Sequence, residues 1–304
     1  MTESLAIPKQ SLLAAIFLSS NETRLRSGWR LVVFILILAV LSIISTYPMK
    51  LLQGRVSEDV WILCNQFISL VIITMAVFLT RRFVDRQPIV SLGLKRNKQA
   101  VIDVFIGILI AFFMFGLIFT IELSLGWLKI EGFSWQVESG SALVTGLLLW
   151  LAIFLIAGWQ EELLSRGYIL QNLTGGLNLF WGVLISSSIF AVMHRGNPGA
   201  TWTSTLGILL AGLSLALPYI LTRQLWMSIG LHIGWNFFEG VIFGFPVSGN
   251  STFHLIRQTV SGPDLMTGGS FGPEAGLVLV PALTLSALLV WGYVHFSRKQ
   301  STIK

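Results

Sequence analysis

The sequence has little charge and almost no cysteine. Asp, Glu, Lys and Arg make up 11% of its 304 residues, whereas hydrophobic residues make up 54%. Soluble domains carry roughly 25% charged residues, so this composition argues against a soluble domain and is typical of a membrane protein. The one cysteine, Cys64, excludes an intrachain disulfide and any zinc site built from several cysteines.

Long apolar runs dominate the sequence instead. Each is near or above the roughly 17–25 residues that a helix needs to cross a bilayer, although the fifth is marginal. The runs are 30–47, 60–80, 100–128, 142–160, 178–194, 202–221, 225–244 and 275–296. We therefore predict an all-α fold: a polytopic integral membrane protein with about eight transmembrane helices.

The same pattern divides the chain into three regions. Residues 1–141 would hold an N-terminal surface segment and the first three helices. The apolar stretch 11–18 is too short to cross a membrane, and no small-residue cleavage site follows the first long run. Residues 142–245 would hold helices four to seven. Residues 246–304 would hold a long outer loop, the eighth helix and a cytoplasmic tail.

The basic residues are spread unevenly over the predicted loops. With the N-terminus placed inside, fifteen of the 20 Lys and Arg residues lie on the inner side and five on the outer side. The positive-inside rule then predicts cytoplasmic N- and C-termini. We expect the protein in the cell (plasma) membrane. Because the rule accounts for the basic residues, the net charge of +6 does not require nucleic acid as a partner. The inner residues are Lys9, Arg24, Arg26, Arg30, Arg81, Arg82, Arg86, Lys95, Arg96, Lys98, Arg166, Arg223, Arg298, Lys299 and Lys304; the outer ones are Lys50, Arg55, Lys129, Arg195 and Arg257.

Two adjacent acids interrupt the fourth apolar run. Ionisable groups at membrane depth are costly and indicate a functional site by default. Glu162 and Arg166 are four residues apart, so on a helix they share a face and could form an ion pair as structural support. Glu161 points about 100° away and has no obvious neutralising neighbour, which makes it a candidate general base.

Two further motifs follow in the fifth and seventh predicted helices. The first is Phe190-x-x-x-His194, and the second is His232-x-x-x-Asn236, whose spacing puts both side chains on one helix face. Counting about 1.5 Å per residue from the cytoplasmic turns places these residues and Glu161 ~13–24 Å from the cytoplasmic face of the membrane. Three helices thus bring polar side chains to similar depths, which predicts one shared cavity.

The segments EELLSRG, FAVMH and HIGWN resemble the three motifs of the CAAX prenyl endopeptidase and bacteriocin-processing (CPBP, or Abi) family of intramembrane proteases. The resemblance covers roughly residues 142–245, which would be the catalytic core. It implies cleavage of a peptide or membrane-protein substrate, lipidated or otherwise membrane-associated, in the lipid bilayer. Glu161 and His194 would activate a water molecule, and His232 and Asn236 would stabilise the oxyanion.

The cofactor requirement has two alternatives. The family is often described as metalloproteases, and Glu161, His194 and His232 could form a three-ligand zinc site with an open position for water. The HExxH signature of many zinc proteases is absent. A metal-free mechanism driven by the glutamate fits the same residues, and we favour it.

A different class of function would use the same polar residues. In a transporter, a non-catalytic scaffold or an immunity protein they would relay protons, bind a ligand or join helices. Transporters often contain repeated halves. Here the polar residues are concentrated in helices four to seven, which favours an enzyme. Glu239, seven residues after His232, lies near the predicted outer end of its helix, where water would solvate it.

Overall fold

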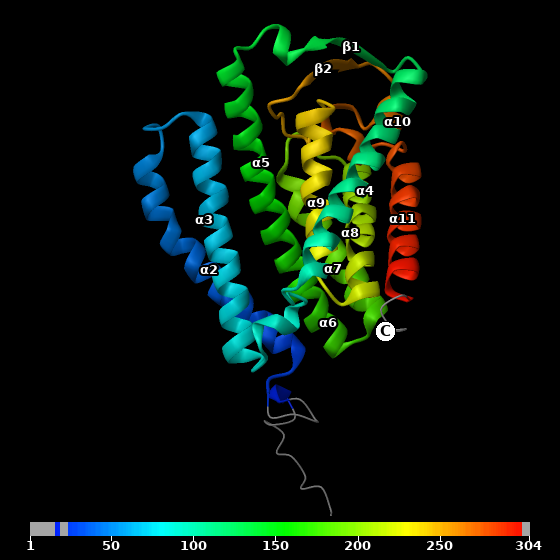
Figure 1. The fold of residues 1–304 in the computed structure, drawn as a ribbon. Helices are drawn as coiled ribbons and strands as arrows, with labels where there is room; N and C mark the ends of the chain where they lie inside the picture. The colour runs from blue at the N-terminus through cyan, green and yellow to red at the C-terminus, as the bar shows by residue number, and fades with distance from the viewer. Residues whose placement is uncertain (1–15, 19–23, 300–304) are drawn as a thin grey trace, which may run out of the picture.

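Seven helices in the described part of the chain are long and apolar enough to cross a membrane (Figure 1). The computed structural model describes residues 16–18 and 24–299. The predicted polytopic, mainly helical membrane fold is thereby confirmed, while most of the predicted surface segment 11–18 lies outside the described residues. The seven spans contain α2 (Ser27–Leu52), α3 (Glu58–Leu79), α4 (Lys98–Ser124), α5 (Gly140–Glu162), α7 (Leu179–Met193), α8 (Trp202–Thr222) and α11 (Leu279–Lys299). The spans that hold α3, α5 and α7 continue without a break to Val84, Gly176 and Gly196.

The run predicted as the seventh span, residues 225–244, forms a shorter helix in the centre of the bundle. α9 (Trp226–Asn236) continues as the π-helix η6 (Phe237–Ile242), and every residue from Met227 to Asn236 is buried. Figure 1 shows α9 surrounded by α4, α5 and α8. A helix that is apolar all round can face either lipid or a protein core, and here it forms the core. The sequence analysis counted this core helix as an eighth transmembrane helix because its composition is equally apolar.

Small residues bring α4 against α9. A Cβ added to Gly107 of α4 would meet the backbone of Met227 and Leu231, and one added to Gly230 of α9 would overlap the backbone of Val104. Glycine at such positions lets two helices approach closely, so that dispersion contacts between them accumulate. This contact fixes the position of α9, and with it the height of the third motif.

The fourth run continues past α5 without a break. After Glu162 the chain forms the π-helix η4 (Leu163–Ile169) and then α6 (Leu170–Gly176). The third motif is followed in the same way, since η6 begins directly after Asn236. π-Turns inside helices are rare and often occur at functional sites. Both the first and the third motif thus end in a widened helical turn.

Two strands cover one end of the bundle, a feature that the apolar runs did not predict. β1 (Leu128–Phe133) joins α4 to α5 and pairs antiparallel with β2 (Ile256–Val260). β2, α10 (Asp264–Thr267) and the 3₁₀ turn η8 (Pro273–Ala275) lie in the predicted outer loop. This end is opposite the one where α2 begins and α11 ends (Figure 1).

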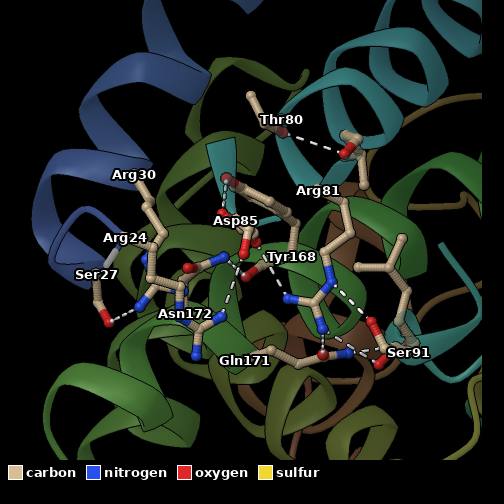
Figure 2. A network of polar contacts seen from close by, with 12 residues as sticks. Arg24, Ser27, Arg30, Thr80, Arg81, Asp85, Ser91, Tyr168, Gln171 and Asn172 are labelled. Carbon is tan, nitrogen blue, oxygen red and sulfur yellow. Dashed lines mark hydrogen bonds and ion pairs between the residues drawn. The ribbon is translucent and has the colours of Figure 1, made fainter. Parts of the chain in front are cut away.

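A buried polar network closes the other end (Figure 2). Asp85 is fully buried, and its carboxylate accepts hydrogen bonds from Arg81 Nη1 at 3.1 Å and from the Tyr168 hydroxyl at 3.2 Å. Arg81 also donates to Ser91 Oγ at 3.0 Å and to Gln171 Oε1 at 3.3 Å. The network ties the segment after α3 to η4 and α6, so the helix that carries Glu161 is anchored at this end.

Candidate active site

The buried carboxylate of Glu162 joins two of the three motifs. Its Oε1 accepts a hydrogen bond from Arg166 Nη1 at 2.6 Å and contacts His232 Nδ1 at 2.8 Å. Arg166 also donates from Nη2 to the Gly212 carbonyl of α8 at 2.8 Å. Glu162 and Arg166 are almost completely buried, so each charge depends on the other for compensation. The ion pair predicted between Glu162 and Arg166 is thus present, although Arg166 lies in the π-helix η4.

Glu161 points away from this pair and toward two histidines. Its Oε2 lies 3.9 Å from His194 Nε2 and 3.8 Å from His232 Nε2. These distances are too long for direct hydrogen bonds, and polar groups at such a separation can both bind the same water molecule. The structure thus brings together side chains from α5, α9 and the turn after α7, as the sequence analysis expected.

The hydrogen bonds of the two imidazole rings decide which nitrogen faces Glu161. His194 Nδ1 lies 2.8 Å from the Phe190 carbonyl oxygen, which can only accept. His232 Nδ1 contacts the Glu162 carboxylate. Both Nδ1 atoms therefore carry the hydrogen, and both Nε2 atoms are left to interact with groups near Glu161.

Phe190 packs against the charged groups of the site. Its ring centroid lies 4.6 Å from the Arg166 guanidinium carbon, 4.6 Å from the His194 ring and 6.0 Å from the His232 ring. A cation over an aromatic face is stabilised, and the ring also excludes water from Arg166. Phe190 thus packs the second motif against the other two.

A cavity of about 740 Å³ contains the predicted site residues Glu161, His194, His232 and Asn236. Asn236 lies one helical turn beyond His232 on α9, and its side chain is largely buried. Gln160 and Gln66 of α3 also line it, and Gln160 Nε2 donates a hydrogen bond to Gln66 Oε1 at 2.8 Å. α3 therefore belongs to the wall of the cavity, although its sequence contains no motif.

Glu274 is a site residue that the sequence analysis did not identify. It lies in η8, lines the same cavity, and accepts hydrogen bonds from Trp235 Nε1 at 2.9 Å and Ser248 Oγ at 2.6 Å. Burial is the main cause that raises the pKa of Glu274, and the two hydrogen bonds and His194 oppose that shift. An acidic residue in a Gly- and Pro-rich loop resembles any solvated loop acid, so no signal marked it.

The expectation for Glu239 was wrong. Instead of reaching water at a helix end, Glu239 is fully buried in η6, close to Trp235 and Glu274. The reason is that β2 and η8 fold over the end of α9, where the apolar runs predicted open solvent. Two acidic side chains, Glu239 and Glu274, thus lie close to Trp235.

The three candidate zinc ligands have the donor chemistry of a zinc site. Two imidazole nitrogens and a carboxylate are donors that zinc accepts. Among residues 16–18 and 24–299, however, no three His, Cys, Asp or Glu side chains are placed to hold a metal ion. Zinc binding by Glu161, His194 and His232 stays a prediction.

Replacement of Arg166 tests whether the pair is structural. Arg166→Ala would leave Glu162 as an uncompensated buried charge, which should lower the free energy of unfolding by about 3–5 kcal/mol. We expect a lower folded yield and a lower melting temperature in detergent. The matched control is Lys129→Ala, which removes the cation of the exposed pair with Glu131 at 3.1 Å, and should change stability by at most ~1 kcal/mol. Wild-type stability in Arg166→Ala, with activity lost, would instead make Arg166 a substrate-binding residue.

One family model matches the part of the chain that contains all three motifs. Residues 143–238 match the model described as type II CAAX prenyl endopeptidase Rce1-like. No curated protein and no solved structure matches the chain. The match covers α5 to the beginning of η6, and therefore Glu161, His194, His232 and Asn236. The resemblance given by the motifs is confirmed: residues 143–238 are a domain of the Rce1-like type II CAAX prenyl endopeptidase family.

Proposed function

We propose that this protein is an intramembrane endopeptidase in which Glu161 and His194 activate a water molecule. The observation that carries the proposal is the contact of one carboxylate oxygen with two histidine Nε2 atoms from separate segments, at 3.8 and 3.9 Å. These groups line a cavity inside a bundle of apolar helices, within the segment that matches the protease family. The substrate is a peptide or membrane protein that reaches the cavity from the bilayer or its surface.

Hydrolysis begins with proton transfer to Glu161. The carboxylate takes one proton from water while His194 Nε2 accepts a hydrogen bond and orients the molecule. The hydroxide oxygen forms a bond to the carbonyl carbon of the substrate. The C–N bond then breaks, and the proton held by Glu161 passes to the leaving amine. The hydroxyl group of the water molecule becomes part of the new carboxyl group, and its other hydrogen is carried by the amine.

His232 and Asn236 would stabilise the tetrahedral intermediate. The nearby formal charges are two carboxylates, Glu161 and Glu162, and one guanidinium, so a protonated His232 would balance them. Its Nε2–H could then donate to the oxyanion, with the Asn236 amide as a second donor. Glu162 keeps the imidazole of His232 oriented for this role.

Two substitutions separate the base from the oxyanion donor. Glu161→Gln preserves size but cannot accept the proton, so hydrolysis should be lost while the melting temperature is retained. Asn236→Ala removes one donor and should lower the rate ~10²–10³-fold without abolishing it. Activity can be measured on a quenched fluorescent peptide library in proteoliposomes, and by comparing membrane proteomes of cells with wild type or Glu161→Gln. If these proteomes and peptide products are identical, the endopeptidase proposal fails and a transporter or scaffold is favoured.

The proposed mechanism requires no metal, and chelation tests this. After dialysis against a strong chelator, with metal content then measured by mass spectrometry, wild-type activity should be largely retained. A zinc enzyme would instead contain about one zinc per chain, held by three protein ligands and a water molecule. Loss of activity together with that zinc, and recovery on adding zinc back, would make Glu161, His194 and His232 ligands rather than base and donors.

We also propose that both termini are cytoplasmic in the plasma membrane, because basic residues are concentrated at the end of the bundle where α2 begins and α11 ends. The single cysteine makes a labelling test simple. In a Cys64→Ser background, Val137→Cys at the β1–β2 end should react with a membrane-impermeant maleimide in intact cells. Arg96→Cys, exposed at the opposite end, should react only after permeabilisation. The reverse pattern would invert the proposed orientation.

A further inference from the structure

One acid of the outer loop contacts two different segments around the proposed active site. Glu274 of η8 is 4% exposed, and each of its carboxyl oxygens accepts a hydrogen bond from a different donor. Oε1 accepts from Trp235 Nε1 of α9 at 2.9 Å, and Oε2 accepts from Ser248 Oγ, in the loop after η6, at 2.6 Å. Burying a carboxyl group is costly unless hydrogen bonds satisfy it, and here two of them also fix its orientation.

The first hydrogen bond holds the helix of the third motif. Trp235 is 2% exposed, directly precedes Asn236 and follows His232 by three residues. Its ring packs edge-on against Phe115 of α4, with 5.3 Å between the centroids. The indole N–H can only donate, so the bond to Glu274 fixes the direction in which this part of α9 faces. A rotation of α9 at this residue would move the imidazole and the amide of the third motif together.

The second hydrogen bond leads to the second motif. The Ser248 carbonyl accepts from Asn197 Nδ2 at 3.0 Å, and the Asn197 backbone N–H donates to the His194 carbonyl at 3.1 Å. Ser248 has a φ of +47°, a left-handed conformation that is uncommon for a residue with a side chain. Such a conformation persists only where the surrounding contacts hold it. Its hydroxyl and its carbonyl thus connect Glu274 with the turn that carries His194.

Close packing restricts the turn that carries Glu274. A Cβ added to Gly207 of α8 would overlap the backbone carbonyl oxygen of Glu274, so α8 passes directly against η8. Phe271 and Ala275, on either side of Glu274, belong to one buried cluster with Phe190 of the second motif. In an interior packed this tightly, a group has little freedom to shift. The carboxyl group is therefore held in one place relative to both motifs.

From these contacts we infer that Glu274 is a positioning residue for the proposed hydrolysis, whose two hydrogen bonds hold His194 and His232 at fixed distances from Glu161. The inference rests on the proposed function, because it assigns the histidines a catalytic role in this cavity. Glu274 lies outside residues 143–238, so the outer loop completes the geometry of the three motifs. It acts through Trp235 and Ser248, without contacting the substrate.

The kinetics of three variants test this role on the best-cleaved peptide of the library in proteoliposomes. Glu274→Ala removes both acceptors and should lower kcat ~10²-fold with KM unchanged, because a misplacement of about 1 Å can cost that much in rate. Glu274→Gln keeps an acceptor for Trp235, and its amide can donate to the Ser248 hydroxyl, so kcat should return close to the wild-type value. Glu122→Ala is the matched control and should keep kcat, because Glu122 is also fully buried but does not line the cavity.

Two kinetic outcomes would contradict the inference. A lower melting temperature in Glu274→Ala, with wild-type kcat below that temperature, would mean that the residue serves stability alone. A folded Glu274→Gln protein as slow as Glu274→Ala would mean that charge, not the hydrogen bonds, is responsible. If Glu274→Ala does not fold, Ser248→Ala replaces it, because it removes only the hydroxyl and keeps the carbonyl for Asn197. It should lower kcat with KM unchanged, and a wild-type kcat would overturn the inference.

Imidazole NMR reports the positions of the rings without any need for turnover. The chain has four histidines, so His254→Gln and His295→Gln leave His194 and His232 as the only ¹⁵N-labelled rings. Each should give one sharp set of signals in this background and with Glu274→Gln, but shifted or multiple signals with Glu274→Ala. Changed signals, with no hydrolysis of any peptide by the wild type, would support the positioning of the rings and overturn the endopeptidase proposal. Unchanged signals, with hydrolysis by the wild type, would overturn only the role of Glu274.

Discussion

The site depends on one buried carboxylate oxygen, Oε1 of Glu162, which is shared by Arg166 and His232. This contact joins the helix of the first motif to the helix of the third, and Arg166 extends it to α8 through the Gly212 carbonyl. Because these charges are removed from water, loss of any one of them would leave an uncompensated buried charge and destabilise the protein. Their geometry leaves Glu161 on the neighbouring face, turned toward the Nε2 atoms of both histidines.

The bundle gives that contact a rigid setting. α9 is enclosed on all sides and held against α4 by glycine contacts, so His232 and Asn236 have a fixed height. The network around Asp85 anchors η4 and α6 at the opposite end from the strands. Water-activating groups must be held in place before the substrate arrives, because reorganisation during the reaction adds to the barrier. A site on a buried helix between two anchored ends meets that requirement.

The segments outside the family match complete the cavity. α3 contributes Glu58 and Gln66, and the turn η8 contributes Glu274 next to Trp235. None of these residues lies within 143–238. The matched segment therefore carries the proposed chemistry, while the surrounding helices and the outer loop set the shape and charge of the space that a substrate enters. Specificity can thus differ between proteins that share the three motifs.

The sequence by itself determined the membrane class, the positions of seven spanning helices and the motif residues, because lipid demands long apolar helices and makes a buried charge conspicuous. Only the tertiary structure decided that residues 225–244 form a core helix, since lipid and a protein interior are equally apolar. It also decided that Glu239 is buried and that Glu274 reaches the cavity. Those positions depend on how a distant loop folds back over α9, and such long-range contacts have no local pattern in the chain.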